Sequence, residues 1–122
     1  MISSILAGLI GAIVVSALAY AIVRIAFLTF SVIKEKIKEK LNNGPGTIGA
    51  TAVVSVQTLL DSAPEISLDD FGPKVEENDY LLFGIKKDGT LDENADIIRA
   101  GSVDEQLTDT MEGYGGIIKI IG

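Results

Sequence analysis

Three aspartates spaced four residues apart carry oxygen ligands of the kind that calcium binds: Asp88, Asp92 and Asp96. An EF-hand loop, however, places its carboxylates at positions 1, 3 and 5 and a glutamate at position 12, and this chain lacks that spacing. We therefore expect these carboxylates to lie in solvated turns and at helix caps, and we expect no metal site.

Two pairs of adjacent acids have the side chains of a general acid and a general base: Asp69 with Asp70, and Glu76 with Glu77. Such chemistry requires a cleft that shifts the pKa values of the two carboxyl groups apart. Both pairs lie in the segment 61–79, whose proline, glycine and acidic residues predict an extended surface loop. We therefore expect ordinary exposed acids at these positions.

The rest of the composition does not favour catalysis either. The chain has no Cys, His or Trp, which excludes thiol nucleophiles, imidazole bases and zinc sites built on these residues. Gly113, Gly115 and Gly116 flank Tyr114 without the Lys-Ser/Thr pair of a phosphate-binding loop, so a hinge or tight turn is expected there. We expect a protein that is not an enzyme, has no cofactor and acts on no small-molecule substrate.

The N-terminus is the most distinctive region of the sequence. Residues 1–23 contain no charged side chain, and as a helix rising about 1.5 Å per residue they would span the roughly 30 Å core of a bilayer. A cleaved signal peptide and a long buried core helix are the alternatives, although no basic residue precedes the apolar core as in a signal peptide. Small residues on one face predict close helix–helix packing through Ser4, Ala7, Gly8, Gly11, Ala12 and Ser16.

An amphipathic stem continues the predicted helix. Arg24 interrupts the apolar run near the expected membrane exit, and apolar residues from Phe30 to Leu41 then recur at spacings of three and four. The polar positions of the stem carry Lys34, Lys36, Lys38 and Lys40. These lysines form either a solvated helix face or, together with Arg24, a set of charges that contact anionic lipid or a neighbouring subunit.

Charge is divided unevenly along the chain. The net charge of −7 combines +3 on residues 1–42 with −10 on residues 43–122. The acidic part repels nucleic acid, so we expect no nucleic-acid partner. The opposite charges of the two parts predict attraction between the stem of one subunit and the acidic part of the next.

The chain divides into three regions on these patterns. Residues 1–42 form the apolar assembly or transmembrane helix with its stem, residues 43–47 form a Gly/Pro linker, and residues 48–122 form a small acidic head domain. The predicted fold class is α+β, with a long N-terminal apolar, membrane-type helix continued as an amphipathic stem and followed by a small α+β head.

Strands of the head are expected at three places. Residues 48–60 form either a strand centred on residues 52–56 or a second helix. Residues 80–85 predict a strand that ends in a turn at residues 87–89, and residues 117–121 predict a terminal strand that pairs with residues 80–85 or adds to a sheet in another subunit.

Two short helices are expected from capping-box patterns. Thr90 with Glu93 predicts a helix over the following ten residues, although residues 96–100 also fit a strand. Ser102 with Glu105 predicts a second helix that ends at Gly113.

In its layout the chain resembles pilin-type filament subunits. It combines an apolar N-terminal helix with small residues, an amphipathic stem and a small head. The resemblance implies helices bundled into the core of a filament. Ile5 stands where bacterial type IV pilins carry an acidic residue, and no functional residues follow from the resemblance.

Two functions are consistent with these patterns. The first is a non-enzymatic structural subunit that self-assembles through its N-terminal helix into a filament or membrane oligomer, with itself and membrane lipid as partners. The second is a single-pass membrane anchor that presents a small acidic binding or regulatory domain. The small-residue face favours self-assembly. Either function predicts a location in the membrane, or at the cell surface for a filament.

Overall fold

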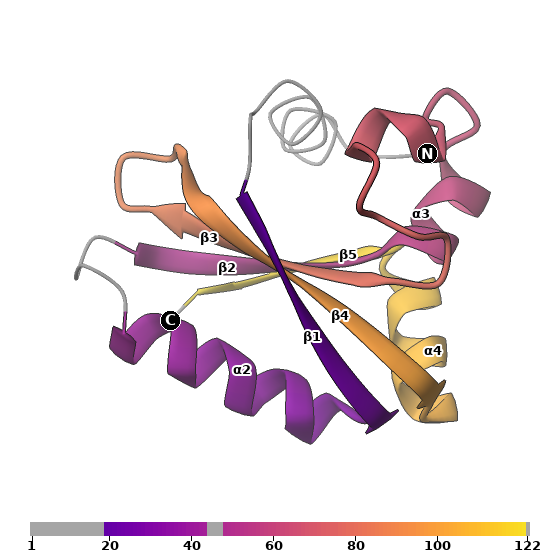
Figure 1. Ribbon diagram of the computed structural model, residues 1–122, viewed down its shortest axis with the longest axis horizontal. Helices are drawn as coiled ribbons and strands as arrows, with labels where there is room; N and C mark the ends of the chain where they lie inside the picture. Colours follow the sequence, from indigo (N-terminus) through magenta and orange to yellow (C-terminus); the bar gives the residue numbers. More distant parts are fainter. Residues whose placement is uncertain (1–18, 44–47, 122) are drawn as a thin grey trace.

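A mixed sheet lies at the centre of the structure, a computed structural model that describes residues 19–43 and 48–121 (Figure 1). β1 runs parallel to β4, whereas the pairs β4–β3, β3–β2 and β2–β5 are antiparallel, which gives the order β1-β4-β3-β2-β5. The strands are β1 (Ala19–Leu28), β2 (Ile48–Ser55), β3 (Tyr80–Lys86), β4 (Leu91–Val103) and β5 (Ile117–Ile121).

Helices of the described residues cover both faces of this sheet. They are α2 (Phe30–Asn43), α3 (Val56–Ser62), the short 3-10 helix η1 (Leu68–Phe71) and α4 (Glu105–Gly113). α2 and α4 pack on one face, where Ile33 and Leu107 share a buried cluster with Val53 of β2. α3, η1 and the loop that leads to β3 cover the opposite face. The described residues therefore form a small mixed α+β domain.

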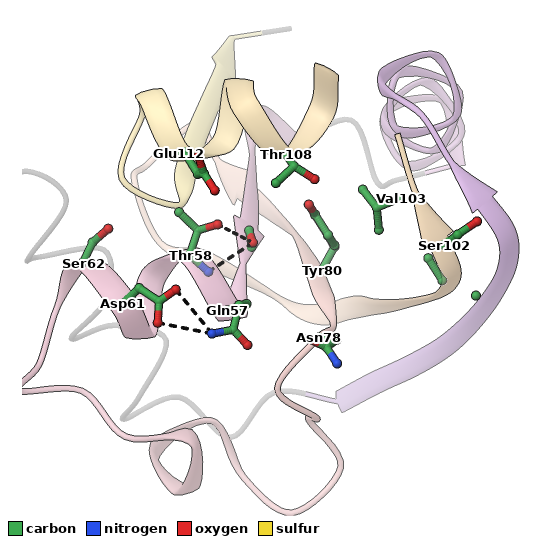
Figure 2. Close-up of a pocket in the computed structure, with 13 residues that line it drawn as sticks. Gln57, Thr58, Asp61, Ser62, Asn78, Tyr80, Ser102, Val103, Thr108 and Glu112 are labelled. Atoms are coloured by element: carbon green, nitrogen blue, oxygen red, sulfur yellow. Dashed lines mark hydrogen bonds between the residues drawn. The ribbon is translucent and has the colours of Figure 1, made fainter. Parts of the chain in front are cut away.

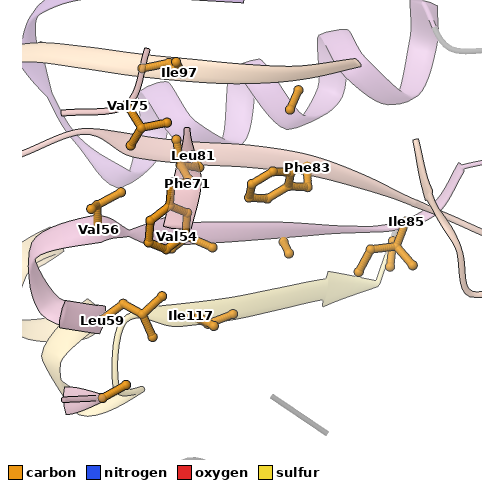
Figure 3. Close-up of a cluster of buried hydrophobic side chains, with 14 residues drawn as sticks. Val54, Val56, Leu59, Phe71, Val75, Leu81, Phe83, Ile85, Ile97 and Ile117 are labelled. Carbon is orange, nitrogen blue, oxygen red and sulfur yellow. The ribbon is translucent and has the colours of Figure 1, made fainter. Parts of the chain in front are cut away.

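The central strands are apolar on both sides because both of their faces are buried. In β2, Val53 faces α2 while its neighbour Val54 faces α3. Figure 3 shows the cluster on the α3 side, where Val54 and Phe83 from the sheet lie near Leu59 of α3 and Phe71 of η1. This burial accounts for the uncharged run over residues 48–60, which is a strand followed directly by a helix and so contains both of the predicted alternatives.

The predicted continuous N-terminal helix is wrong, because residues 19–28 form strand β1. This strand pairs with β4 in parallel, for example Tyr20 with Ala95 and Ile25 with Ala100. Its sequence is rich in aromatic and β-branched residues, which fit a pleated surface, and a short apolar run does not distinguish a strand from a buried helix.

Thr29 separates β1 from α2. Its hydroxyl accepts a hydrogen bond from the backbone N–H of Val32 at 3.3 Å, and its carbonyl accepts one from Ile33 at 3.2 Å. Threonine in this role satisfies free N–H groups at a helix start. The amphipathic stem is therefore a separate helix, α2, which lies against the same sheet that β1 joins.

The expected membrane or cell-surface location is also wrong. Among the described residues, no helix is long and apolar enough to cross a bilayer. The longest of these helices, α2, has 14 residues, fewer than the roughly 20 that a span requires. The transmembrane and pilin-like description of the chain is corrected accordingly.

Some of the short elements predicted for the head are confirmed by the structure, and others are wrong. β3 and its turn are confirmed, and so is the helix before Gly113, although Asp104 rather than Ser102 precedes its first residue. The helix predicted after Thr90 is wrong, because that segment is the long strand β4. The terminal strand is confirmed as β5, but it pairs with β2 and not with residues 80–85.

Candidate functional site

Strand β1 is the most unusual surface of the described structure. It is the last strand of the sheet at one side, so one of its edges pairs with β4 while no described strand pairs with the other (Figure 1). An edge of this kind presents unpaired backbone N–H and C=O groups that can pair with another strand.

Apolar side chains line this strand and remain accessible. Phe27 is 53% exposed and Ile22 is 43% exposed, and in the described part of the chain the only other exposed large apolar residue is Tyr114, at 61%. Val23 and Ile25 are half-buried, and the single charge on the strand is Arg24, which is exposed. Because large exposed apolar groups gathered on one element mark contact surfaces, β1 is the candidate functional site.

The order of residues along β1 is compatible with antiparallel pairing of two copies. Ile25 packs against the buried cluster beneath α2, and Val23 pairs in register with Ile98 of the same cluster. With two Ile25 residues opposite each other, Val23 of one copy lies opposite Phe27 of the other. Arg24 then lies opposite Ala26 and not opposite a second arginine. This register matches apolar groups and avoids direct opposition of like charges.

Comparisons with known proteins do not add a candidate. No protein-family model matches the chain. Comparison with curated proteins and with solved structures finds no similar protein either.

The six small residues predicted as a helix interface, Ser4, Ala7, Gly8, Gly11, Ala12 and Ser16, lie outside the described residues. Their role stays a prediction. The predicted charge set consists of Arg24 and four lysines. Arg24 lies on β1, beside Arg99 of β4 in the strand register.

Two lysines of the predicted charge set have partners within α2 itself. The ammonium of Lys34 lies 5.1 Å from the ring centroid of Phe30, and the ammonium of Lys36 lies 3.4 Å from a carboxylate oxygen of Glu39. Pairs of this spacing are neighbours on a helix surface and contribute modestly to its stability.

The other two lysines differ in their contacts. Lys40 reaches from α2 to β4, where its ammonium lies 3.6 Å from a carboxylate oxygen of Asp96. Lys38 is exposed. The contact between Lys40 and Asp96 joins the basic helix to the acidic part of the same chain, which is the kind of attraction that the charge division predicted between subunits.

Of the candidate acids, Asp88 lies in a turn as expected, whereas Asp92 and Asp96 lie half-buried on strand β4 and not at a helix cap. Asp88 accepts hydrogen bonds from the hydroxyl and the N–H of Thr90 at 2.6 and 2.9 Å, which lower the pKa of Asp88. Asp69, Asp70 and the pair at 76–77 are exposed. Within the described ranges, no three His, Cys, Asp or Glu side chains meet as metal ligands.

Sequence reasoning missed β1 as a surface because it assigned these residues to a helix. Two features of the sequence point to the strand. One is the content of aromatic and β-branched residues, such as Tyr20, Ile22 and Val23, and the other is a threonine directly before the amphipathic helix.

Proposed function

We propose that the chain is a non-enzymatic subunit that self-associates through β1. Two copies pair their β1 strands antiparallel and form one sheet that continues across both subunits. The observation that carries this proposal is the pairing-competent edge of β1 together with the exposure of Phe27 and Ile22.

Burial of apolar side chains supports the energetics of this pairing. Removing a large apolar side chain from water contributes about 1.5–3 kcal/mol when burial is complete, and Phe27 and Ile22 are each about half exposed before association. Backbone hydrogen bonds between the two edges add to this and fix the register. Arg24 keeps the pairing selective, because a register that opposes two arginines is unfavourable.

The small residues of the N-terminal segment offer a second contact between copies. Packing through Gly8 and Ala12 stays a prediction from the sequence, and mutations there and on β1 test the two contacts separately.

The test is the mass of the full chain as a function of concentration, by light scattering and analytical ultracentrifugation. Phe27→Glu places a charge on β1 in place of an exposed apolar side chain, and it is expected to weaken self-association at least about tenfold. Tyr114→Glu is the matched control, because it places the same charge at an exposed aromatic residue outside β1, and it is expected to associate as the parent does.

Two results would overturn the proposal. One is a parent chain that stays monomeric up to millimolar concentration. The other is self-association that survives Phe27→Glu and is lost in Gly8→Leu, which would assign the interface to the N-terminal segment. Circular dichroism of each variant verifies that the fold is retained.

A further inference from the structure

A pocket opens between α3 and α4, at the end of the sheet where β2 and β4 finish (Figure 2). It encloses about 520 Å³, within the range of about 300–1,000 Å³ that is usual for small-molecule sites. Its walls come from α3, α4, the start of β3 and the last residues of β4. Four separate segments therefore meet there, and none of them is part of the β1 edge.

The charge of the pocket is negative. Asp61 of α3 and Glu112 of α4 line it, and no described Lys or Arg does. Asp61 accepts hydrogen bonds from the side-chain amide of Gln57 at 3.2 and 3.3 Å, whereas no ion pair of the described residues involves Glu112. An anionic ligand would meet uncompensated like charge here, so the pocket favours a cation.

Hydroxyl groups form the inner wall. Tyr80 is 5% exposed, and Figure 2 shows its hydroxyl directed toward Thr108. Burial raises the pKa of Tyr80 above its ordinary value of 10.0, so this hydroxyl is neutral at pH 7. Ser55, which pairs with Tyr80 in the strand register, has its hydroxyl 3.1 Å from that of Thr58. Hydroxyl groups can accept as well as donate hydrogen bonds and ionised carboxylates only accept them, so the pocket can receive a ligand with several donors.

From this arrangement we infer that the pocket binds a small organic cation that carries primary ammonium groups, with Glu112 and Asp61 as charge partners and Tyr80 and Thr108 as hydrogen-bond acceptors. An ammonium group has three donors and no acceptor, and it therefore complements a wall of hydroxyl and carboxylate oxygens. A carboxylate on each of two facing helices suits a ligand with an ammonium group at each end. This binding goes beyond self-association and does not require it.

Three probes with the same four-carbon chain test the assignment by calorimetry and NMR titration of the full chain: putrescine, the corresponding diol and succinate. They differ only in their end groups, which are ammonium, hydroxyl and carboxylate. Putrescine is expected to bind saturably with a dissociation constant below about 1 mM, and the diol and succinate are expected not to saturate in that range.

Glu112→Gln keeps the shape of the side chain and removes its charge, and it is expected to weaken putrescine binding about tenfold. Asp109→Asn is the matched control, because Asp109 is an exposed acid of the same helix that does not line the pocket. It is expected to change the dissociation constant less than about twofold, the effect of a distant screened charge.

Three outcomes would overturn the inference. The first is the absence of saturable putrescine binding. The second is binding of the diol as tight as that of putrescine, which would show that charge is not recognised. The third is an equal loss in Asp109→Asn and Glu112→Gln, which would show that the cation only responds to the net negative charge of the protein.

Discussion

At the scale of single residues, Asp79 and Arg99 join a long loop to the sheet. Asp79 is 2% exposed and is the only charged residue among the buried ones of the described structure. Arg99 of β4 binds both of its carboxylate oxygens, with Nε 3.0 Å from Oδ1 and Nη2 2.9 Å from Oδ2. Arg99 Nη2 also donates to the carbonyl of Lys74 at 2.9 Å, and the N–H of Glu76 donates to Asp79. The arginine thus holds both the carboxylate and the loop backbone.

Arg99→Gln is expected to lower the free energy of unfolding by about 2–3 kcal/mol, because it leaves a buried carboxylate without its partner. Lys74→Gln removes the same charge from an exposed residue of the same loop and is expected to change stability by less than about 0.5 kcal/mol. Urea titration measures both values. Equal stability losses in the two variants would show that the pair contributes nothing beyond its net charge.

At the scale of elements, the predictions from the sequence succeeded where local chemistry decides the structure. β3 with its turn, α4 and the glycine turn before β5 follow from patterns of a few residues. β1 could not be predicted in that way, because its apolar run fits a helix equally well and its partner β4 lies about 75 residues further along the chain, as the pairing of Ile22 with Ile97 shows. The capping box at Thr90 failed for the same reason, since pairing with two neighbouring strands outweighed the local signal.

The glycine turn allows a sharp comparison of two residues. Gly116 has a φ of +98°, and a Cβ there would lie 2.6 Å from the backbone nitrogen of Leu59, so α3 and the turn approach each other too closely for a side chain. Gly113 ends α4 with nothing within 4 Å of its Cβ position.

Gly116→Ala is therefore expected to lower the free energy of unfolding by more than about 2 kcal/mol, through strain and displacement of backbone. Gly113→Ala is expected to be neutral or to stabilise by up to about 1 kcal/mol, since alanine is the better helix former. Thermal and chemical unfolding measure the stability of the two variants. Equal stabilities would contradict the close approach at Gly116.

At the scale of the whole molecule, the acidic and basic parts of the chain meet within one subunit. α2 packs on strands of the acidic part such as β2 and β3, and Lys40 contacts Asp96 across the boundary between the two parts. Neither this contact nor the pocket between α3 and α4 could be predicted from the sequence, because each depends on which elements the sheet order brings together. The same order leaves β1 at an edge of the described sheet, which is the basis of the proposed self-association.

The pairing of two β1 strands is tested most directly by cysteine cross-linking, because the chain contains no cysteine of its own. Single cysteines are introduced at Val23, Arg24 or Ile25 of the full chain, with Tyr114→Cys as a measure of random collision. Directly opposite residues of antiparallel strands have Cα atoms about 4.5–5.5 Å apart, within the range that a disulfide spans.

Under mild oxidation, Ile25→Cys is expected to form a covalent dimer fastest, because only this position lies opposite itself in the proposed register. Two cysteines at position 24 would be about 8 Å apart, beyond disulfide reach, and those at position 23 further still. Non-reducing electrophoresis measures the rates. Fastest cross-linking at Ile25 would support the account, and rates for all three β1 variants no greater than that of Tyr114→Cys would contradict it.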